Sequence, residues 1–211
     1  HHHLGLGKGV HLTTLSVSNE KRDCRIFEEF ASVLIHKARA LRQDEPFDLP
    51  VNGNVYAFDS STISLCLSLF PWARFKYGKS AVKLHAQYDV RTNIPSLVVV
   101  TPASVNDKRG IDFLCIEHGS YYIFDRGYND FARLYSINLK DGYFVIRAND
   151  NLKFRRIYSI KGERDKSIIA DQIGVFTTGL SPKRYPDKIR RVKYHDFEQN
   201  RTFVFLTNDF E

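Results

Sequence analysis

The chain has 211 residues, of which 43% are hydrophobic and 26% charged, a composition typical of a soluble globular protein with one sizeable domain. No apolar run approaches the roughly eighteen residues that cross a bilayer, and no signal-peptide pattern opens the sequence, so we expect a cytoplasmic protein without a membrane partner. Three widely spaced cysteines, Cys24, Cys66 and Cys115, form no CxxC pair, which argues against a zinc site or a disulfide framework and predicts buried free thiols.

The formal net charge of +7 is unevenly distributed. Residues 151–211 hold 13 Lys and Arg against 8 Asp and Glu, a net of +5, whereas residues 1–150 have a net of +2. A basic surplus gathered in one segment suits a polyanion such as nucleic acid, although many basic domains bind none.

The N-terminal part predicts a lead-in and one helix. Residues 1–17 are rich in Gly, then in Ser and Thr, and open with three histidines that are either a tag remnant or native sequence. From Ser18 as N-cap, a helix is expected to about Gln43. Prolines 46 and 50 then end regular structure, so residues 18–50 form an N-terminal helix and linker. The apolar stripe of this helix comprises Ile26, Phe27, Phe30, Val33, Leu34 and Leu41.

Residues 51–150 have the pattern of a mixed α/β sheet. Strands are expected at 55–59, 82–90, 97–100, 121–125 and 143–146, the second and third forming a hairpin. Helices are expected near Asp107 and after Asn129 as N-cap. The short β-like runs of residues 151–211 predict a basic, β-rich insertion after the fifth strand, rather than more of the same sheet.

Two aspartates occupy nearly identical settings at predicted strand ends. One lies in Phe58-Asp59-Ser60-Ser61 and the other in Phe124-Asp125-Arg126-Gly127. Side chains at the carboxyl ends of neighbouring parallel strands converge, and two close carboxylates are tolerated mainly around a divalent cation such as Mg²⁺. The alternative is that each aspartate only caps a helix or forms a turn.

These motifs resemble those of bacterial insertion-sequence transposases of the DDE class. Asp125-Arg126-Gly127-Tyr128 resembles their second-aspartate motif, and Ala57-Phe58-Asp59-Ser60-Ser61-Thr62-Ile63 resembles their first-aspartate strand. The likeness covers most of the chain from about residue 12. It implies a ribonuclease H-like fold in which Asp59 and Asp125 are catalytic metal ligands, with Mg²⁺ as the metal and Mn²⁺ as a substitute. It also implies that the protein acts on double-stranded DNA, both at the element ends and at the target. The DNA-bound form is expected to be a homodimer in a nucleoid-associated complex.

The resemblance also implies a third carboxylate, on a helix after the insertion in the pattern Y-x-x-R-x-x-x-E. No such pattern occurs here, and Glu211 directly follows the last β-like run without a preceding helix. We therefore expect the third carboxylate beyond residue 211 and expect this chain, alone, to be inactive.

Basic residues supply candidate DNA contacts, each with a solvated surface or an ordered turn as the alternative. One stretch interleaves cations with Trp72, Phe75 and Tyr77. His85 shares a predicted strand face with Lys83, but is interpreted as a structural hydrogen-bonding residue. The candidates are Arg74, Lys76, Lys79, Lys83, Arg126, Tyr128, Arg190 and Arg191, with Lys188 and Lys193 beside the last two.

The sequence therefore predicts a DNA transposase that cleaves insertion-sequence ends and transfers strands into target DNA. A ribonuclease H-like nuclease without strand transfer shares the same metal site. A non-catalytic DNA-binding remnant would keep salt-sensitive binding but lose the metal. An α/β protein unrelated to nucleic acid would hold the two aspartates far apart.

Overall fold

The computed structural model describes residues 11–211 apart from 48, 67, 69, 76–77 and 161–164. The chain divides into two compact units, His1–Arg42 and Gln43–Glu211. The boundary follows the N-terminal helix directly, so the segment expected to link it to the sheet belongs to the second unit. Among the described residues, no helix is both long and apolar enough to span a membrane.

The first unit contains two helices where the sequence predicted one. Helix α1 (Leu12–Lys21) occupies part of the expected irregular lead-in, and Arg22 is extended, with ψ 141°. Helix α2 (Arg25–Arg42) then begins where Asp23 accepts a hydrogen bond from the Arg25 backbone N–H at 3.0 Å. The single helix from Ser18 is therefore a wrong prediction: the apolar stripe lies wholly within α2, and the Asp23 turn separates that helix from Ser18.

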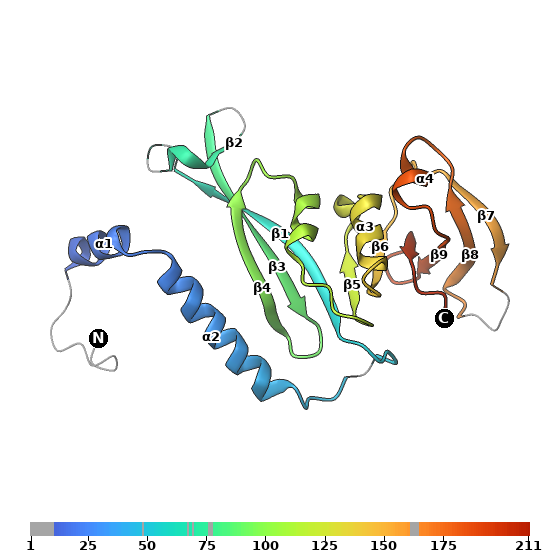
Figure 1. Cartoon of the computed structure of the whole chain (residues 1–211), viewed down its shortest axis with the longest axis horizontal. Helices are drawn as coiled ribbons and strands as arrows, with labels where there is room; N and C mark the ends of the chain where they lie inside the picture. Colours follow the sequence, from blue (N-terminus) through green and yellow to red (C-terminus); the bar gives the residue numbers. More distant parts are fainter. Residues whose placement is uncertain (1–10, 48, 67, 69, 76–77, 161–164) are drawn as a thin grey trace. The chain divides into compact units, whose positions relative to one another are not determined.

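The second unit is built on a ten-stranded sheet (Figure 1), in the order β2-β3-β1-β5-β6-β10-β9-β8-β7, with β4 paired to β3. Strands β1, β5 and β6 are parallel neighbours, and the other pairs are antiparallel. The strands are β1 (Val55–Leu65), β2 (Arg74–Phe75), β3 (Lys79–Asp89), β4 (Ile94–Pro102), β5 (Tyr121–Phe124), β6 (Tyr143–Arg147), β7 (Phe154–Ser159), β8 (Ile168–Phe176), β9 (Ile189–Asp196) and β10 (Arg201–Thr207). The α/β class and the β3–β4 hairpin are confirmed.

One face of the sheet carries the main core. Alternate residues of the parallel strands, such as Tyr56, Phe58, Tyr122 and Phe124, are buried there, as the period of two along a strand requires. Helix α3 (Phe131–Asn138) lies against β6 (Figure 1) and contributes Leu134 to the same cluster. The short 3-10 helix η3 (Asp107–Phe113) also packs against it.

The helix starts differ slightly from expectation. Asp130, not Asn129, caps α3, and its side chain accepts from the Arg133 backbone N–H. Asn129 instead donates its amide to the carbonyl oxygens of Arg126 and Arg147, at 2.9 and 2.8 Å. The expected helix near Asp107 is a 3-10 helix capped by Asn106.

Residues 151–211 extend the sheet, which contradicts their interpretation as a segment outside it. Strand β10 pairs antiparallel with β6 through Phe205, Leu206 and Thr207, and β9, β8 and β7 follow outward. The parallel strand β6 leaves one edge open, and β10 satisfies its hydrogen-bonding groups. A β-rich composition could not reveal this partner, because strand pairing is non-local. The four-residue helix α4 (Ser181–Arg184) lies between β8 and β9.

The cysteines also differ from expectation. Cys24, Cys66 and Cys115 form no disulfide bond with one another among the described residues, and all three are exposed rather than buried.

Candidate metal and DNA site

The strand register brings Asp59 and Asp125 to corresponding positions on neighbouring parallel strands. Strands β1 and β5 pair from Val55 with Tyr121 to Phe58 with Phe124. Asp59, within β1, and Asp125, directly after β5, are the next residues along each chain segment, at the point where this pairing ends. The predicted placement on neighbouring parallel strands is confirmed.

Asp59 does not end its strand, contrary to expectation. Strand β1 continues to Leu65, and residues 59–65 pair only with β3 in the register. The sequence suggested an end because polar Ser60, Ser61 and Thr62 follow the apolar run. Residues 59–65 tolerate polar side chains, because this part of β1 is paired on one side only and the other side lacks a neighbouring strand.

Both carboxylates face away from the main core. Phe58 and Phe124 are only 2% and 4% exposed, whereas Asp59 and Asp125 are exposed, in keeping with the alternation of side chains along extended backbone. Asp125 has φ −78° and ψ 175°, and its Oδ1 accepts a hydrogen bond from the Gly127 N–H at 2.6 Å. This bond begins the 3-10 turn η4 (Arg126–Tyr128). A Cβ on Gly127 would lie 2.9 Å from the same oxygen, so glycine suits this turn.

An aromatic triangle supports the two aspartates from beneath. The ring centroids of Phe58 and Phe124 lie 6.1 Å apart, and Tyr128 lies 5.5 and 5.8 Å from them. Because Phe58 and Phe124 directly precede the two aspartates, this packing fixes the spacing of the backbone just before each of them.

The pair fits a divalent cation that retains water ligands. Two exposed carboxylates supply hard oxygen donors, and only one oxygen of Asp125 is occupied by the Gly127 N–H. In the described part of the chain, no group of three or more His, Cys, Asp and Glu side chains could hold a metal ion. The protein would thus provide two ligands here, a number that suits Mg²⁺.

Comparison with known proteins decides the family. The family model described as transposase DDE domain matches residues 52–210. The chain belongs to this family. The resemblance to DDE-class insertion-sequence transposases is therefore confirmed.

Several proteins named as transposases are similar to this chain. The protein y4zB of Sinorhizobium fredii is 32% identical over 72% of this chain and 43% of its own length. A protein for insertion sequence element IS5377 of Geobacillus stearothermophilus is 26% identical over 71% of this chain and 39% of its own length. A protein for element IS4SA of Synechocystis is 23% identical over 81% and 50%, respectively. The chain thus spans about half or less of these relatives.

Among solved structures, a piggyBac transposase synaptic complex with hairpin DNA is similar at TM-score 0.45 and 12% identity. The match covers 75% of this chain and 34% of the piggyBac chain.

Beside the aspartate pair, the DDE domain contains a polar network that the sequence did not predict. Ser60 Oγ donates to Asp107 Oδ1 at 2.7 Å, and Lys83 Nζ lies 2.8 Å from the same oxygen. Lys83 also donates to the Val105 carbonyl oxygen at 2.7 Å. Asp107 opens η3, and its position in Asn106-Asp107 resembled an ordinary helix start, so only the fold reveals its link to β1.

Lys83 and Tyr128 are poor DNA contacts, contrary to prediction. Lys83 is 8% exposed and its ammonium is engaged in the network just described. Tyr128 is 2% exposed, and its buried hydroxyl lies near the Ser60 side chain but makes no hydrogen bond of standard geometry among the residues that the structure describes. Burial, together with nearby Asp59, Asp107 and Asp125, raises the pKa of Tyr128 well above its usual range.

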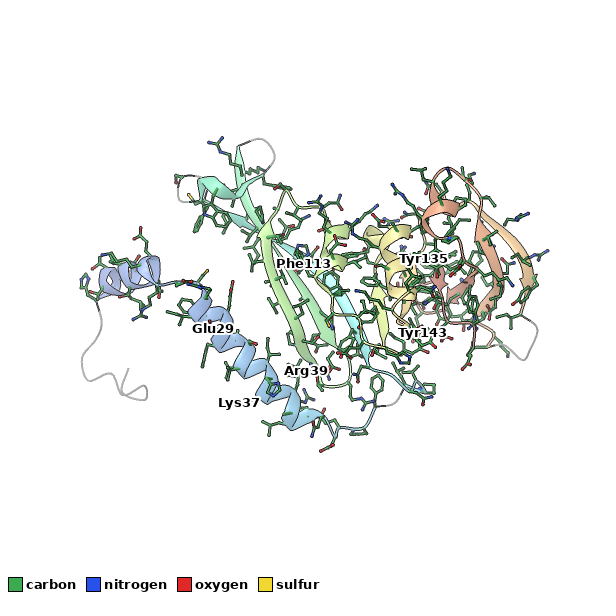
Figure 2. The ribbon with its side chains drawn as sticks, in the orientation of Figure 1. Glu29, Lys37, Arg39, Phe113, Tyr135 and Tyr143 are labelled. Carbon is green, nitrogen blue, oxygen red and sulfur yellow. The ribbon has the colours of Figure 1, made fainter. Side chains whose placement is uncertain are left out.

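His85 is structural, as interpreted from the sequence. It is fully buried, and its Nε2 lies 2.9 Å from Thr101 Oγ1. The ring stacks on Phe58 with 6.3 Å between centroids and packs against Phe113, labelled in Figure 2, at 5.7 Å. Burial lowers the pKa of His85, so its neutral form is favoured. The predicted alternation of β3 is correct, but the buried face is the polar one, with Lys83 and His85.

Exposed cations remain at the β2–β3 hairpin and near Asp125. Arg74 and Lys79 are exposed, and so is Trp72, two residues before β2, at 63%. Lys76 lies outside the described residues. Arg126 is exposed and lies 3.7 Å from Asp150, itself 97% exposed, so this weak pair leaves the guanidinium accessible.

The two predicted arginines of β9 are occupied by other side chains. Arg190 makes a bidentate contact with the Asp171 carboxylate at 2.9 and 3.0 Å. Arg191 stacks 4.5 Å over the Phe154 ring. Neither guanidinium is freely available to a phosphate, whereas Lys188 and Lys193 nearby are exposed.

Proposed function

We propose that this chain is part of a DNA transposase with a ribonuclease H-like core, in which Asp59 and Asp125 hold catalytic Mg²⁺. The reaction would cleave DNA at the ends of an insertion sequence and join the freed 3′-hydroxyl to target DNA. The register of β1 and β5 supports this proposal, because Asp59 and Asp125 each directly follow the last paired residue of two neighbouring parallel strands.

The residues of the chain would position the reacting phosphate. Asp59 and Asp125 project from a sheet edge fixed by the aromatic triangle, so their oxygens are held before DNA binds. A divalent cation bound there would supply Lewis acidity and shield charge at the scissile phosphate. Mn²⁺, which also prefers oxygen ligands, would substitute.

Exposed cations would hold the DNA backbone around this edge. Arg126 follows Asp125 directly, and Arg74 and Lys79 lie on the β2–β3 hairpin that extends β1 and β3. Contacts from such side chains to phosphates fix the register of the duplex without reading its sequence. We assign double-stranded DNA as the partner and a homodimer as the DNA-bound form.

The test is an assay for joined DNA products with Mg²⁺. It compares this chain with one extended through a Y-x-x-R-x-x-x-E helix, since a second metal position needs a third carboxylate. We expect the extended chain to join strands and the 211-residue chain to be inactive. Asp59→Ala or Asp125→Ala should abolish joining, whereas Asp112→Ala, an exposed carboxylate on η3, should not.

Three outcomes would contradict all or part of the proposal. Cleavage without joined products would indicate a nuclease of the same fold. DNA binding without metal binding or cleavage would indicate a non-catalytic DNA-binding protein. Strand joining by the 211-residue chain alone would show that the third carboxylate lies within it.

A further inference from the structure

Asp59 occupies a point where its strand loses support on one side. Up to Phe58, β1 is held between β3 and β5, but from Asp59 onward only β3 is paired with it. A strand held from one side can twist and shift more readily than one held from both. The direction of the Asp59 carboxylate therefore depends on what restrains the residues just after it.

Ser60 provides such a restraint. Its hydroxyl donates to Asp107 Oδ1 at 2.7 Å, and the Lys83 ammonium lies 2.8 Å from the same oxygen. Lys83 in turn donates to the Val105 carbonyl oxygen at 2.7 Å. Four hydrogen-bonding groups thus join β1, β3 and the segment from Val105 to the start of η3. We refer to Ser60, Lys83 and Asp107 as the clamp.

The charges of the clamp favour its persistence. The Lys83 side chain is only 10% exposed, and Asp107 is 43% exposed. Burying the Lys83 ammonium without a counter-charge would cost free energy. The arrangement in which the Asp107 carboxylate contacts this ammonium is therefore favoured. Burial opposes ionisation of Asp107, but the hydrogen bonds from Lys83 and Ser60 hold its pKa below the usual value. Asp107 is therefore ionised at neutral pH.

The clamp does not contribute a metal ligand. Successive side chains of β1 point to opposite faces of the sheet, so Ser60 lies on the face of Phe58, away from the Asp59 carboxylate. Asp107 is on that same side, and its Oδ1 already receives two donors. Across the described ranges, no third carboxylate joins Asp59 and Asp125 in a metal-binding group.

We propose that Ser60, Lys83 and Asp107 form a positioning clamp that fixes the backbone of β1 and so aims the Asp59 carboxylate at the metal. This inference rests on the proposed function. The clamp acts through the Ser60 backbone, which Asp59 directly precedes, and not by touching the metal or the DNA. Loss of the clamp should lower the metal affinity while the melting temperature changes little. Contacts that orient metal ligands without touching the metal typically change metal affinity by about tenfold or more.

The experiment measures Mn²⁺ affinity by water-proton relaxation, and the melting temperature, on the whole chain. The variants are Ser60→Ala, Ser60→Thr and Asp107→Asn. Asp112→Asn is the matched control, because Asp112 lies on the same η3 and pairs with Arg133 at the same 2.8 Å. We expect Ser60→Ala and Asp107→Asn to weaken Mn²⁺ binding about tenfold, Ser60→Thr to retain the affinity, and Asp112→Asn to leave it unchanged.

The inference is overturned if Mn²⁺ affinity is unchanged in Ser60→Ala, or if Asp112→Asn weakens it equally at an equal loss of melting temperature. Asp59→Ala and Asp125→Ala separate this failure from that of the proposed function. If these two variants lose Mn²⁺ while the clamp variants retain it, only the clamp is wrong. If wild type binds no Mn²⁺, or binds it without either aspartate, the proposed function fails, and the clamp with it.

Discussion

At the scale of single residues, the two aspartates depend on side chains buried directly behind them. Tyr128 illustrates this most clearly, because its ring completes the triangle with Phe58 and Phe124 while its buried hydroxyl, near Ser60, makes no hydrogen bond of standard geometry in the described structure. A buried hydroxyl without a hydrogen bond lowers the free energy of unfolding, so the contribution of Tyr128 to stability comes from its ring and not from its hydroxyl.

Tyr128→Phe should therefore leave the free energy of unfolding unchanged or raise it by up to about 1 kcal/mol. Tyr122→Phe is the matched control, since the Tyr122 hydroxyl accepts from the Glu117 N–H at 2.8 Å and donates to the Cys115 carbonyl oxygen at 3.2 Å. This control should lower the free energy of unfolding by about 1 kcal/mol. Denaturant melts of the three proteins measure both values, and a Tyr128→Phe loss equal to that of the control would show that the Tyr128 hydroxyl is satisfied.

At the scale of elements, the paired phenylalanine–aspartate motifs were enough to predict which strands lie together. The apolar runs before Asp59 and Asp125 predicted two buried strands ending at one edge, and the β1–β5 register agrees. The sequence could not show that β1 continues past Asp59, because Ser60 and Ser61 favour turns locally and only pairing with β3 keeps them extended.

The same limit explains the residues that were misassigned. Alternation along β3 showed which side chains share a face, but polarity suggested that Lys83 faces solvent. Its burial depends on Asp107 and Val105, which come more than twenty residues later in the chain. Asp107 itself could not be singled out, because its role depends on a contact with Ser60 across 47 residues.

Strand β10 connects the C-terminal strands to the core. A substitution that destabilises β10 should therefore also destabilise the strands that carry the candidate site. Leu206 is fully buried in the main core and pairs with Ile146 of β6. Leu206→Ala should lower the free energy of unfolding by about 2–5 kcal/mol and speed hydrogen exchange in both β10 and β5. Phe197→Ala, at a 66% exposed position beside β9, is the control and should change neither. Faster exchange confined to residues 151–211 would indicate that they fold separately from the sheet.

At the scale of the whole molecule, the net charge of +7 does not show where DNA would bind. The exposure of each Lys and Arg side chain is the better guide. Arg190 and Arg191 lie in the most basic segment, yet Arg190 is paired with the Asp171 carboxylate and Arg191 stacks on the Phe154 ring. Arg74 and Lys79 lie in the less basic part and are exposed. The DNA-binding surface should therefore follow the exposed side chains.

DNA binding should weaken steeply with salt, with a slope of about −0.9 per phosphate contact. Arg74→Ala and Lys79→Ala should each reduce the magnitude of this slope by about 1. Arg190→Ala should leave the slope unchanged but destabilise the fold by about 3–5 kcal/mol, because it leaves the Asp171 carboxylate, 7% exposed, without its partner. Binding titrations at several salt concentrations, below the melting temperature of each variant, measure the slopes. Equal slopes for wild type and both hairpin variants would exclude the β2–β3 hairpin from the DNA surface.

If Asp59 and Asp125 share one divalent cation site, metal-directed cleavage of the protein should locate the ion beside both residues. Fe²⁺ with ascorbate and peroxide generates hydroxyl radicals that cut the backbone next to the bound ion, and mass spectrometry locates the cuts. We predict cuts near both residue 59 and residue 125, suppressed by excess Mg²⁺ and lost at both places in Asp59→Ala and in Asp125→Ala. Cuts near only one aspartate, or cuts that persist at one when the other is replaced, would contradict a shared site.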